Sequence, residues 1–177
     1  MKYTKTAFGA LLLLMVFNLT TTPTRAQVEK VVVRVDGMSC PFCAYGLEKK
    51  MKKVEGAEKV TININDGTAE LIGKRDPQLN IDALKPAVKD AGFTPRDITI
   101  TVSGMIAEED EAFYLALDGA TSRFALSGSD EFQAFAKTNV GRTQQVRVVG
   151  KLESVDAGKR QDIRHYAVSV ETFEVIK

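Results

Sequence analysis

The chain has 177 residues, with 24 Lys and Arg against 23 Asp and Glu, one His, two Cys and no Trp. This charge balance argues against a protein that binds nucleic acid through its phosphates, because phosphate neutralisation needs a concentrated cationic surface. A hydrophobic content of 44% and a charged content of 27% argue against disorder, collagen and a multi-span membrane protein. The length fits one domain or two small ones, and two cysteines cannot build a disulfide-dense scaffold.

Residues 1–26 have the pattern of a secretory signal peptide. Two lysines supply the positive start, and residues 7–17 form an apolar run of about eleven residues, too short for a bilayer span of about 20. A small-residue cleavage site ends at Ala26 and leaves Gln27 as the first mature residue; an uncleaved anchor is the alternative. We therefore expect a periplasmic or secreted protein without a membrane span after cleavage, in a compartment where dithiols tend to oxidise.

The mature chain begins with a strand followed by a helix. Residues 31–35 are mostly β-branched and precede Asp36-Gly37, which predicts a strand that ends at a turn. A helix should open at Cys40–Cys43, because Pro41 suits a first helical turn, and it should end at Gly56. Apolar residues recur at helical spacing along it and predict its buried face: Ala44, Leu47, Met51 and Val54.

A hairpin, a second helix and a further strand follow. Residues 60–72 consist of two strands with alternating polarity around Asn65-Asp66-Gly67, a strong hairpin signal. Asn80 should cap the second helix, in which Pro86 should introduce a kink or delay the start. Residues 97–102 alternate again and predict a strand. The predicted order βαββαβ is the ferredoxin-like arrangement, and we assign it to a domain of residues 27–99.

The second half is predicted to be mostly strand. Three strands, a short helix capped by Ser129 and two more strands suggest an OB-like β-barrel domain of residues 100–177, so the predicted fold class is α+β. Residues 97–107 fit the last strand of the first domain, the first strand of the second, or one shared strand. Because no Gly/Ser linker separates the halves, we expect them to be closely coupled.

Both cysteines lie where the first strand meets the first helix. Thiolates are soft ligands, and a helix N-terminus lowers the thiol pKa and so favours the thiolate. Cys40 and Cys43 can therefore converge on one soft ion, and two sulfurs suffice for near-linear Cu(I) or Hg(II). Zn(II) normally takes four ligands, and no His, Asp or third Cys is adjacent. Met38 is either a weak third ligand or, as methionine usually is, a packing residue under the loop.

The segment Gly37-Met38-Ser39-Cys40-Pro41-Phe42-Cys43 resembles the GMxCxxC signature of heavy-metal-associated domains. The resemblance covers roughly residues 29–99 and continues through the helix around Leu47, the hairpin at Asp66-Gly67 and Ala91-Gly92-Phe93. This family includes copper chaperones, N-terminal domains of metal-pumping ATPases and periplasmic mercuric-ion carriers. As an exported member of such a family, this chain most resembles the mercuric-ion carriers, but its second half has no counterpart in them.

The resemblance implies that Cys40 and Cys43 are the metal ligands and that one soft ion binds per chain. It places Phe93 at the loop position where family members carry an aromatic residue or a Lys beside the metal. Members that bind zinc often have an acid before the first Cys; Ser39 stands there and favours Cu(I) or Hg(II). The implied function is capture and transfer of the ion, with a membrane metal transporter or a metallochaperone as partner and no enzymatic activity.

A thiol-disulfide oxidoreductase is the main alternative. Cys-x-x-Cys at a helix N-terminus is also the pattern of redox centres, and Thr94-Pro95 provides a proline loop of the type they need. The hairpin at Asp66-Gly67 argues against it, because antiparallel strands between the two helices disrupt the thioredoxin order. A structural disulfide between Cys40 and Cys43 is a further alternative, although its ring would be small and strained.

Other chemical candidates carry weaker signals. His165 has no partner that would make a metal site, and the acidic run 108–111 is most simply a solvated turn. Lysines in the first helix fit either a solvated helix face or a surface that attracts an acidic partner: Lys49, Lys50, Lys52 and Lys53. No basic groove lined by stacking aromatics is evident, so we expect no nucleic-acid partner.

Overall fold

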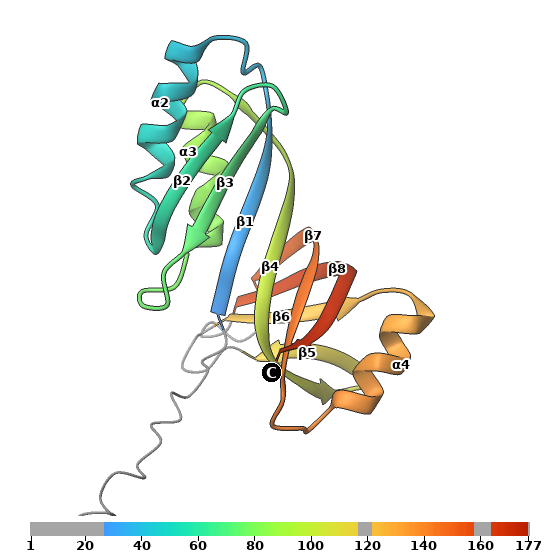
Figure 1. The fold of residues 1–177 in the computed structure, drawn as a ribbon. Coiled ribbons are helices and arrows are strands. Elements are labelled where there is room, and N and C mark those ends of the chain that lie inside the picture. The colour runs from blue at the N-terminus through green and yellow to red at the C-terminus, as the bar shows by residue number, and fades with distance from the viewer. Residues whose placement is uncertain (1–26, 117–121, 158–163, 177) are drawn as a thin grey trace, which may run out of the picture.

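A computed structural model describes residues 27–116, 122–157 and 164–176, and Figure 1 shows their fold. The strands of this part form one eight-stranded sheet with the order β2-β3-β1-β4-β5-β6-β8-β7 and an additional β4–β7 pairing. The elements are, in chain order, β1 (Gln27–Asp36), α2 (Pro41–Met51), β2 (Ala57–Asn63), β3 (Thr68–Gly73), the short 3₁₀-helix η1 (Ile81–Ala83), α3 (Leu84–Asp90), β4 (Thr94–Glu109), β5 (Ala112–Ala116), β6 (Ser122–Ser127), α4 (Asp130–Asn139), β7 (Gln145–Ala157) and β8 (Arg164–Ile176). The predicted signal peptide lies outside the described residues.

The N-terminal unit, from β1 to the first part of β4, has the predicted βαββαβ order. Strand β1 pairs antiparallel with both β3 and β4, and β2 pairs with β3 at the outer edge of the sheet. Helices α2 and α3 lie against the sheet (Figure 1). Val31, Val33 and Val35 of β1 are buried, as the alternation of a strand with one face on the core requires. The ferredoxin-like prediction for this half is therefore confirmed by the strand order.

The second helix starts late, as Pro86 predicts. The segment forms a single 3₁₀ turn at Ile81–Ala83 before α3 begins at Leu84, so that Pro86 stands in the first turn of the α-helix, where its missing N–H costs nothing.

The predicted capping by Asn80 is wrong in one respect. Asn80 occupies the N-cap position, but its side chain makes no capping hydrogen bond, because a 3₁₀ turn places the first N–H groups differently from an α-helix.

The second half forms a closed five-stranded barrel. Its strands follow each other around the barrel as β4, β5, β6, β8 and β7, and β7 returns to β4. The β6–β8 pair is parallel, and the other pairs are antiparallel. Ser129 caps α4 as predicted, since its hydroxyl accepts a hydrogen bond of 3.3 Å from the Phe132 N–H. This closure is compatible with an OB-like domain, and the OB-like assignment itself stays a prediction.

Strand β4 belongs to both halves. It pairs with β1 through residues 94–103, with β7 through residues 99–104 and with β5 through residues 105–109. Of the three alternatives for residues 97–107, the shared strand is the one observed. Residues 100–104 are buried in succession, so both faces of the strand are covered where the halves meet. The predicted boundary between residues 99 and 100 therefore falls inside a continuous strand.

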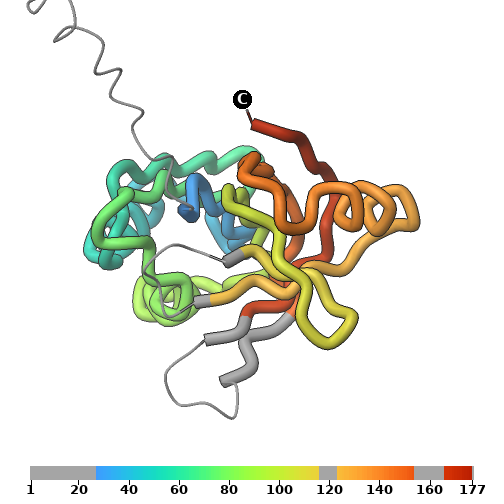
Figure 2. The backbone as a smooth tube through the Cα atoms, turned by 90° about the horizontal axis from the view of Figure 1, so that it is seen from below, coloured from blue at the N-terminus to red at the C-terminus, as the bar shows by residue number. Residues whose placement is uncertain are grey.

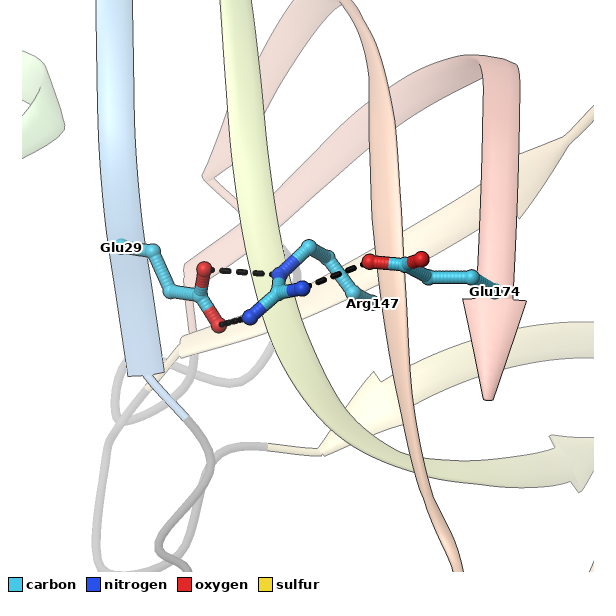
Figure 3. A network of polar contacts seen from close by, with 3 residues as sticks. All are labelled: Glu29, Arg147 and Glu174. Carbon is cyan, nitrogen blue, oxygen red and sulfur yellow. Dashed lines mark hydrogen bonds and ion pairs between the residues drawn. The ribbon is translucent and has the colours of Figure 1, made fainter. Parts of the chain in front are cut away.

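Side-chain contacts also join the two halves. Arg147 of β7 donates to Glu29 of β1 at 2.8 Å and to Glu174 of β8 at 2.6 Å (Figure 3). These carboxylates, Glu29 first, raise the pKa of Arg147. The Tyr166 hydroxyl of β8 donates to Asp82 at 3.1 Å. Since the ion pairs are partly exposed, they orient the two halves more than they stabilise them, and the shared strand supplies the main connection.

Two glycines of the N-terminal unit should respond oppositely to alanine. A Cβ at Gly46, inside α2, would meet nothing within 4 Å, whereas a Cβ at Gly56 would lie 2.3 Å from the Gln78 carbonyl oxygen, at a φ of +78°. We expect Gly46→Ala to raise the free energy of unfolding by about 0.5–1 kcal/mol through helix propensity. Gly56→Ala should lower it by more than about 1 kcal/mol. Urea unfolding checks both, and equal effects would contradict the prediction.

Candidate metal centre

The loop between β1 and α2 is held at both ends. Gly37 has a φ of +92°, a left-handed conformation that favours glycine, and it turns the chain out of β1. The Ser39 N–H donates to the Gly37 carbonyl at 3.0 Å, and the Val35 N–H donates to the Gly67 carbonyl at 2.8 Å. The loop lies at the end of the N-terminal unit that points away from the barrel (Figure 1). The barrel therefore does not cover this loop.

Met38 points into the core beneath this loop. Its side chain is buried and belongs to the same hydrophobic cluster as Val35 and Leu47. Of the two alternatives for this residue, the structure places it in the packing position. Ser39 is exposed, immediately before the first cysteine. The loop thus has an apolar side that anchors it and a polar side that faces solvent.

The two cysteines occupy the start of α2 as free thiols. Cys40 is the N-cap residue, with extended backbone (φ −128°, ψ 127°), and Pro41 follows in the first helical turn. The Ala44 N–H donates to the Cys40 carbonyl at 3.0 Å, which closes the first turn. Cys40 is half-buried and Cys43 is exposed. The turn places both sulfurs on one end of the helix, where an ion can reach them.

The first turn of α2 makes the two thiols unequal. The Cys43 N–H, the Cys43 thiol and the Phe42 N–H all lower the pKa of Cys40, because each can donate toward its sulfur and stabilise the thiolate. The pKa of Cys43 is raised, because its thiol proton is shared with the Cys40 sulfur and because partial burial and the Cys40 charge disfavour a second thiolate. The pair therefore ionises in two steps, with Cys40 first.

Phe93, directly before β4, lies near the start of the cysteine loop. It is half-buried against the core, and its Cδ1 lies 3.7 Å from the point where a Cβ on Gly37 would stand. Arg96 pairs with Asp36 at 2.5 Å and so ties the end of β1 to the start of β4. The Phe93 ring therefore lies close to the turn glycine, and its role as a support of the loop stays a prediction.

Other candidate groups do not gather around a metal site. In the part of the chain that the structure describes, no three or more His, Cys, Asp or Glu side chains are placed to hold an ion together. Within the acidic run 108–111, Glu109 pairs with Arg123 at 2.5 Å, and Asp110 and Glu111 form the turn. The side chain of His165 lies outside the described residues. Among the described helices, none has the length and apolarity that a bilayer crossing requires.

Sequence reasoning missed one feature beside the cysteines. Phe42 and Tyr45, on the first two turns of α2, are 89% and 68% exposed. Aromatic residues usually contribute to a core, so their residue types give no signal of this exposure. The helical period does give a signal of exposure, because Phe42 and Tyr45 both fall outside the apolar stripe of the helix. That stripe consists of Ala44, Leu47 and Met51.

Comparison with known proteins identifies relatives of the N-terminal unit. Residues 32–94 match the heavy-metal-associated domain family. Over 71 residues the chain is 31% identical to the mercuric transport protein periplasmic component of Serratia marcescens, covering 40% of this chain and 77% of that protein. Over 76 residues it is 25% identical to the copper-transporting ATPase 2 of Homo sapiens, covering 41% of this chain but only 5% of the ATPase.

A solved structure gives a similar result. The crystal structure of oxidised MerP from Ralstonia metallidurans CH34 is 30% identical, with a TM-score of 0.35, and the match covers 40% of this chain and 94% of that one. The two curated relatives named above are matched over 41% and 40% of this chain.

The unequal thiols should be visible by alkylation. In the reduced, metal-free protein we expect iodoacetamide to modify Cys40 at lower pH than Cys43, because the thiolate is the nucleophile. Mass spectrometry of peptides after short pulses at different pH values measures both profiles. In Cys43→Ala the profile of Cys40 should shift to higher pH, since one of its donors is gone. Coincident profiles in the wild type would contradict the prediction.

Proposed function

The chain belongs to the heavy-metal-associated domain family, and on this premise we propose that it is an exported carrier that captures one Cu(I) or Hg(II) ion between Cys40 and Cys43 and passes it on by ligand exchange. The observation that carries the proposal is the placement of two free thiols on the first turn of α2, one of them exposed. The named relatives handle mercury and copper, which are both thiophilic.

The donor set supports a soft, two-coordinate ion. Two thiolates and Cu(I) carry a net charge of −1, which the positive end of the α2 dipole stabilises. Zn(II) normally takes four ligands, and only two sulfurs are offered at this loop. We therefore rank Zn(II) below Cu(I) and Hg(II). Capture releases the remaining thiol protons, so ion retention should weaken as the pH falls.

Transfer proceeds by exchange of metal–sulfur bonds. A thiolate of the acceptor bonds to the bound ion, which becomes three-coordinate, and one metal–sulfur bond to Cys43 or Cys40 then breaks. The departing thiolate takes up a proton from water, and a second exchange completes the transfer. No oxidation state changes. The exposure of Cys43 supports this route, because an acceptor can approach its sulfur directly.

The proposed acceptor is a membrane metal transporter or a metallochaperone, and the proposed compartment is the periplasm or the exterior. Within the proposal, residues 100–177 form an OB-like domain that binds a partner or stabilises the carrier. We propose no enzymatic activity, because the sequence offers no apparent nucleophile–base pair at the cysteine motif. The redox alternative draws support from the lowered pKa of Cys40. The antiparallel β2–β3 hairpin between α2 and α3 favours the carrier.

Titration of the reduced protein tests the carrier function. We expect one Cu(I) or Hg(II) per chain, retained against a chelating competitor such as bathocuproine disulfonate for Cu(I), and none in Cys40→Ser or Cys43→Ser. Ser39→Ala and Met38→Leu should retain the ion, because neither residue is a ligand; Met38→Leu nearly conserves volume, at a cost below about 1.5 kcal/mol. Failure of the wild type to retain either ion would overturn the proposal.

An insulin-reduction assay separates the carrier from the redox alternative. In the presence of dithiothreitol, the wild type should accelerate insulin precipitation no more than Cys40→Ser does, because a carrier needs no turnover of a disulfide. A rate near that of a thioredoxin, lost in Cys40→Ser, would instead favour the oxidoreductase.

A further inference from the structure

We infer that the cleft between the two halves of the chain binds a small amino acid or a short peptide, with the ammonium group of the ligand on the floor of the cleft and its carboxylate at Arg75 on the rim. Residues of both halves line this cleft, so neither half forms it alone. Its volume of about 370 Å³ is at the small end of the range for ligand pockets, about 300–1,000 Å³. The inference does not depend on the carrier function, because the cysteine loop lies at the end of the N-terminal unit away from the barrel (Figure 1).

The register of the sheet builds the floor of the cleft. Gln27 of β1 stands opposite Ser103 of β4, and Ser103 stands opposite Arg147 of β7. Arg147 in turn stands opposite Glu174 of β8. Residues directly opposite each other on neighbouring strands project from the same face of a sheet. The four side chains therefore form one polar row, which crosses the junction because β4 belongs to both halves.

Two polar groups of this floor are buried without a partner. Ser103 is only 3% exposed, and no hydrogen bond between described residues engages its hydroxyl. The side-chain oxygen of Gln27 is buried and likewise has no hydrogen-bond partner in the described part of the chain. Buried polar groups nearly always have a partner, because the loss of hydration is otherwise uncompensated. Since both residues line the cleft, a ligand there can supply the missing hydrogen bonds, and the Gln27 oxygen requires a donor.

The charges around the floor favour an ammonium group as that donor. Arg147 lies between Glu29 and Glu174 and pairs with both (Figure 3), so the three groups together carry one net negative charge. Glu58 adds a second, exposed carboxylate that no ion pair between described residues engages. An ammonium group carries three N–H donors and a positive charge, and therefore suits both the amide oxygen and the surplus of carboxylates.

Arg75 supplies the opposite charge on the rim. It is exposed, and no ion pair within the described ranges engages it. A guanidinium matches a carboxylate through two parallel hydrogen bonds, so a ligand that also carries a carboxylate gains a contact that a simple amine lacks. A hard cation such as Ca²⁺ needs six to eight oxygen ligands, whereas the lining residues include only two carboxylates, Glu29 and Glu58. The cleft therefore favours an amino acid or a short peptide.

NMR titration of the reduced, metal-free protein tests the site. We expect glycylglycine and L-lysine to shift the amide signals of Ser103 and Arg147 and to saturate the cleft at about 1 mM or below. N-acetylglycylglycine lacks the ammonium group and glycylglycinamide lacks the carboxylate. Each should bind at least about tenfold more weakly than glycylglycine, because each loses a charge-assisted hydrogen bond. Glycerol and CaCl₂ should give no saturable shift.

Variants of the lining residues locate the ligand. Ser103→Ala should weaken glycylglycine binding about tenfold without lowering the thermal unfolding temperature of the free protein, because the removed hydroxyl has no partner there. Glu58→Gln and Arg75→Gln should each weaken binding and leave the fold intact, since both side chains are exposed. Ser127→Ala is the matched control, because Ser127 is an exposed serine of β6 outside the cleft, and it should bind as the wild type does.

Several results would overturn the inference. They are the absence of any saturable shift, shifts confined to other parts of the chain, equal affinity for N-acetylglycylglycine, and wild-type affinity in Ser103→Ala. A saturable response to CaCl₂ in place of the peptide would assign the cleft to a hard cation and would overturn it as well. The proposed carrier function stands in each of these cases, because it depends on the two thiols.

Discussion

The interaction on which the site depends is that between the N–H groups of the first α2 turn and the Cys40 sulfur. These N–H groups have no partner within the helix, because the first turn of any α-helix leaves its donors unsatisfied. They lower the pKa of Cys40, because they can donate toward its sulfur and stabilise the thiolate. Pro41 helps to fix where the helix begins, and the turn at Gly37 aims the chain into it. In the proposed function, a soft ion would meet two thiols that the start of the helix already places together.

Much of this site is encoded locally and could be predicted. The spacing of the two cysteines, Pro41 at the helix start and the turn glycine are all short-range signals, since each acts through the backbone of its neighbours. The βαββαβ order was equally accessible, because the alternation in β1, β2 and β3 and the hairpin glycine at Gly67 depend on a period of two and a tight turn. Ser129 at α4 belongs to the same class of local signal.

What could not be predicted depends on contacts between distant segments. The sequence around Ile100 fits either half, because burial of both faces of β4 arises only when β1 and β7 lie on its two sides. The 3₁₀ turn that leaves Asn80 without a capping bond depends likewise on how the segment enters α3. The outward direction of Phe42 and Tyr45 follows from which helix face the sheet covers. Arg147 illustrates the same limit, since its partner Glu29 lies 118 residues away along the chain.

The shared strand limits how far the two halves can move relative to each other. Because β4 is continuous through both halves and Arg147 and Tyr166 add contacts across the junction, the barrel cannot swing freely toward the cysteine loop. The loop stands at the end of the N-terminal unit away from the barrel (Figure 1), and the view from below in Figure 2 shows the blue-to-green N-terminal unit and the orange helix of the barrel on opposite sides. A partner bound to the barrel would therefore leave the dithiol accessible. In the proposed carrier, a partner on the barrel would leave the opposite end free for release of the ion, because β4 runs continuously from one half into the other.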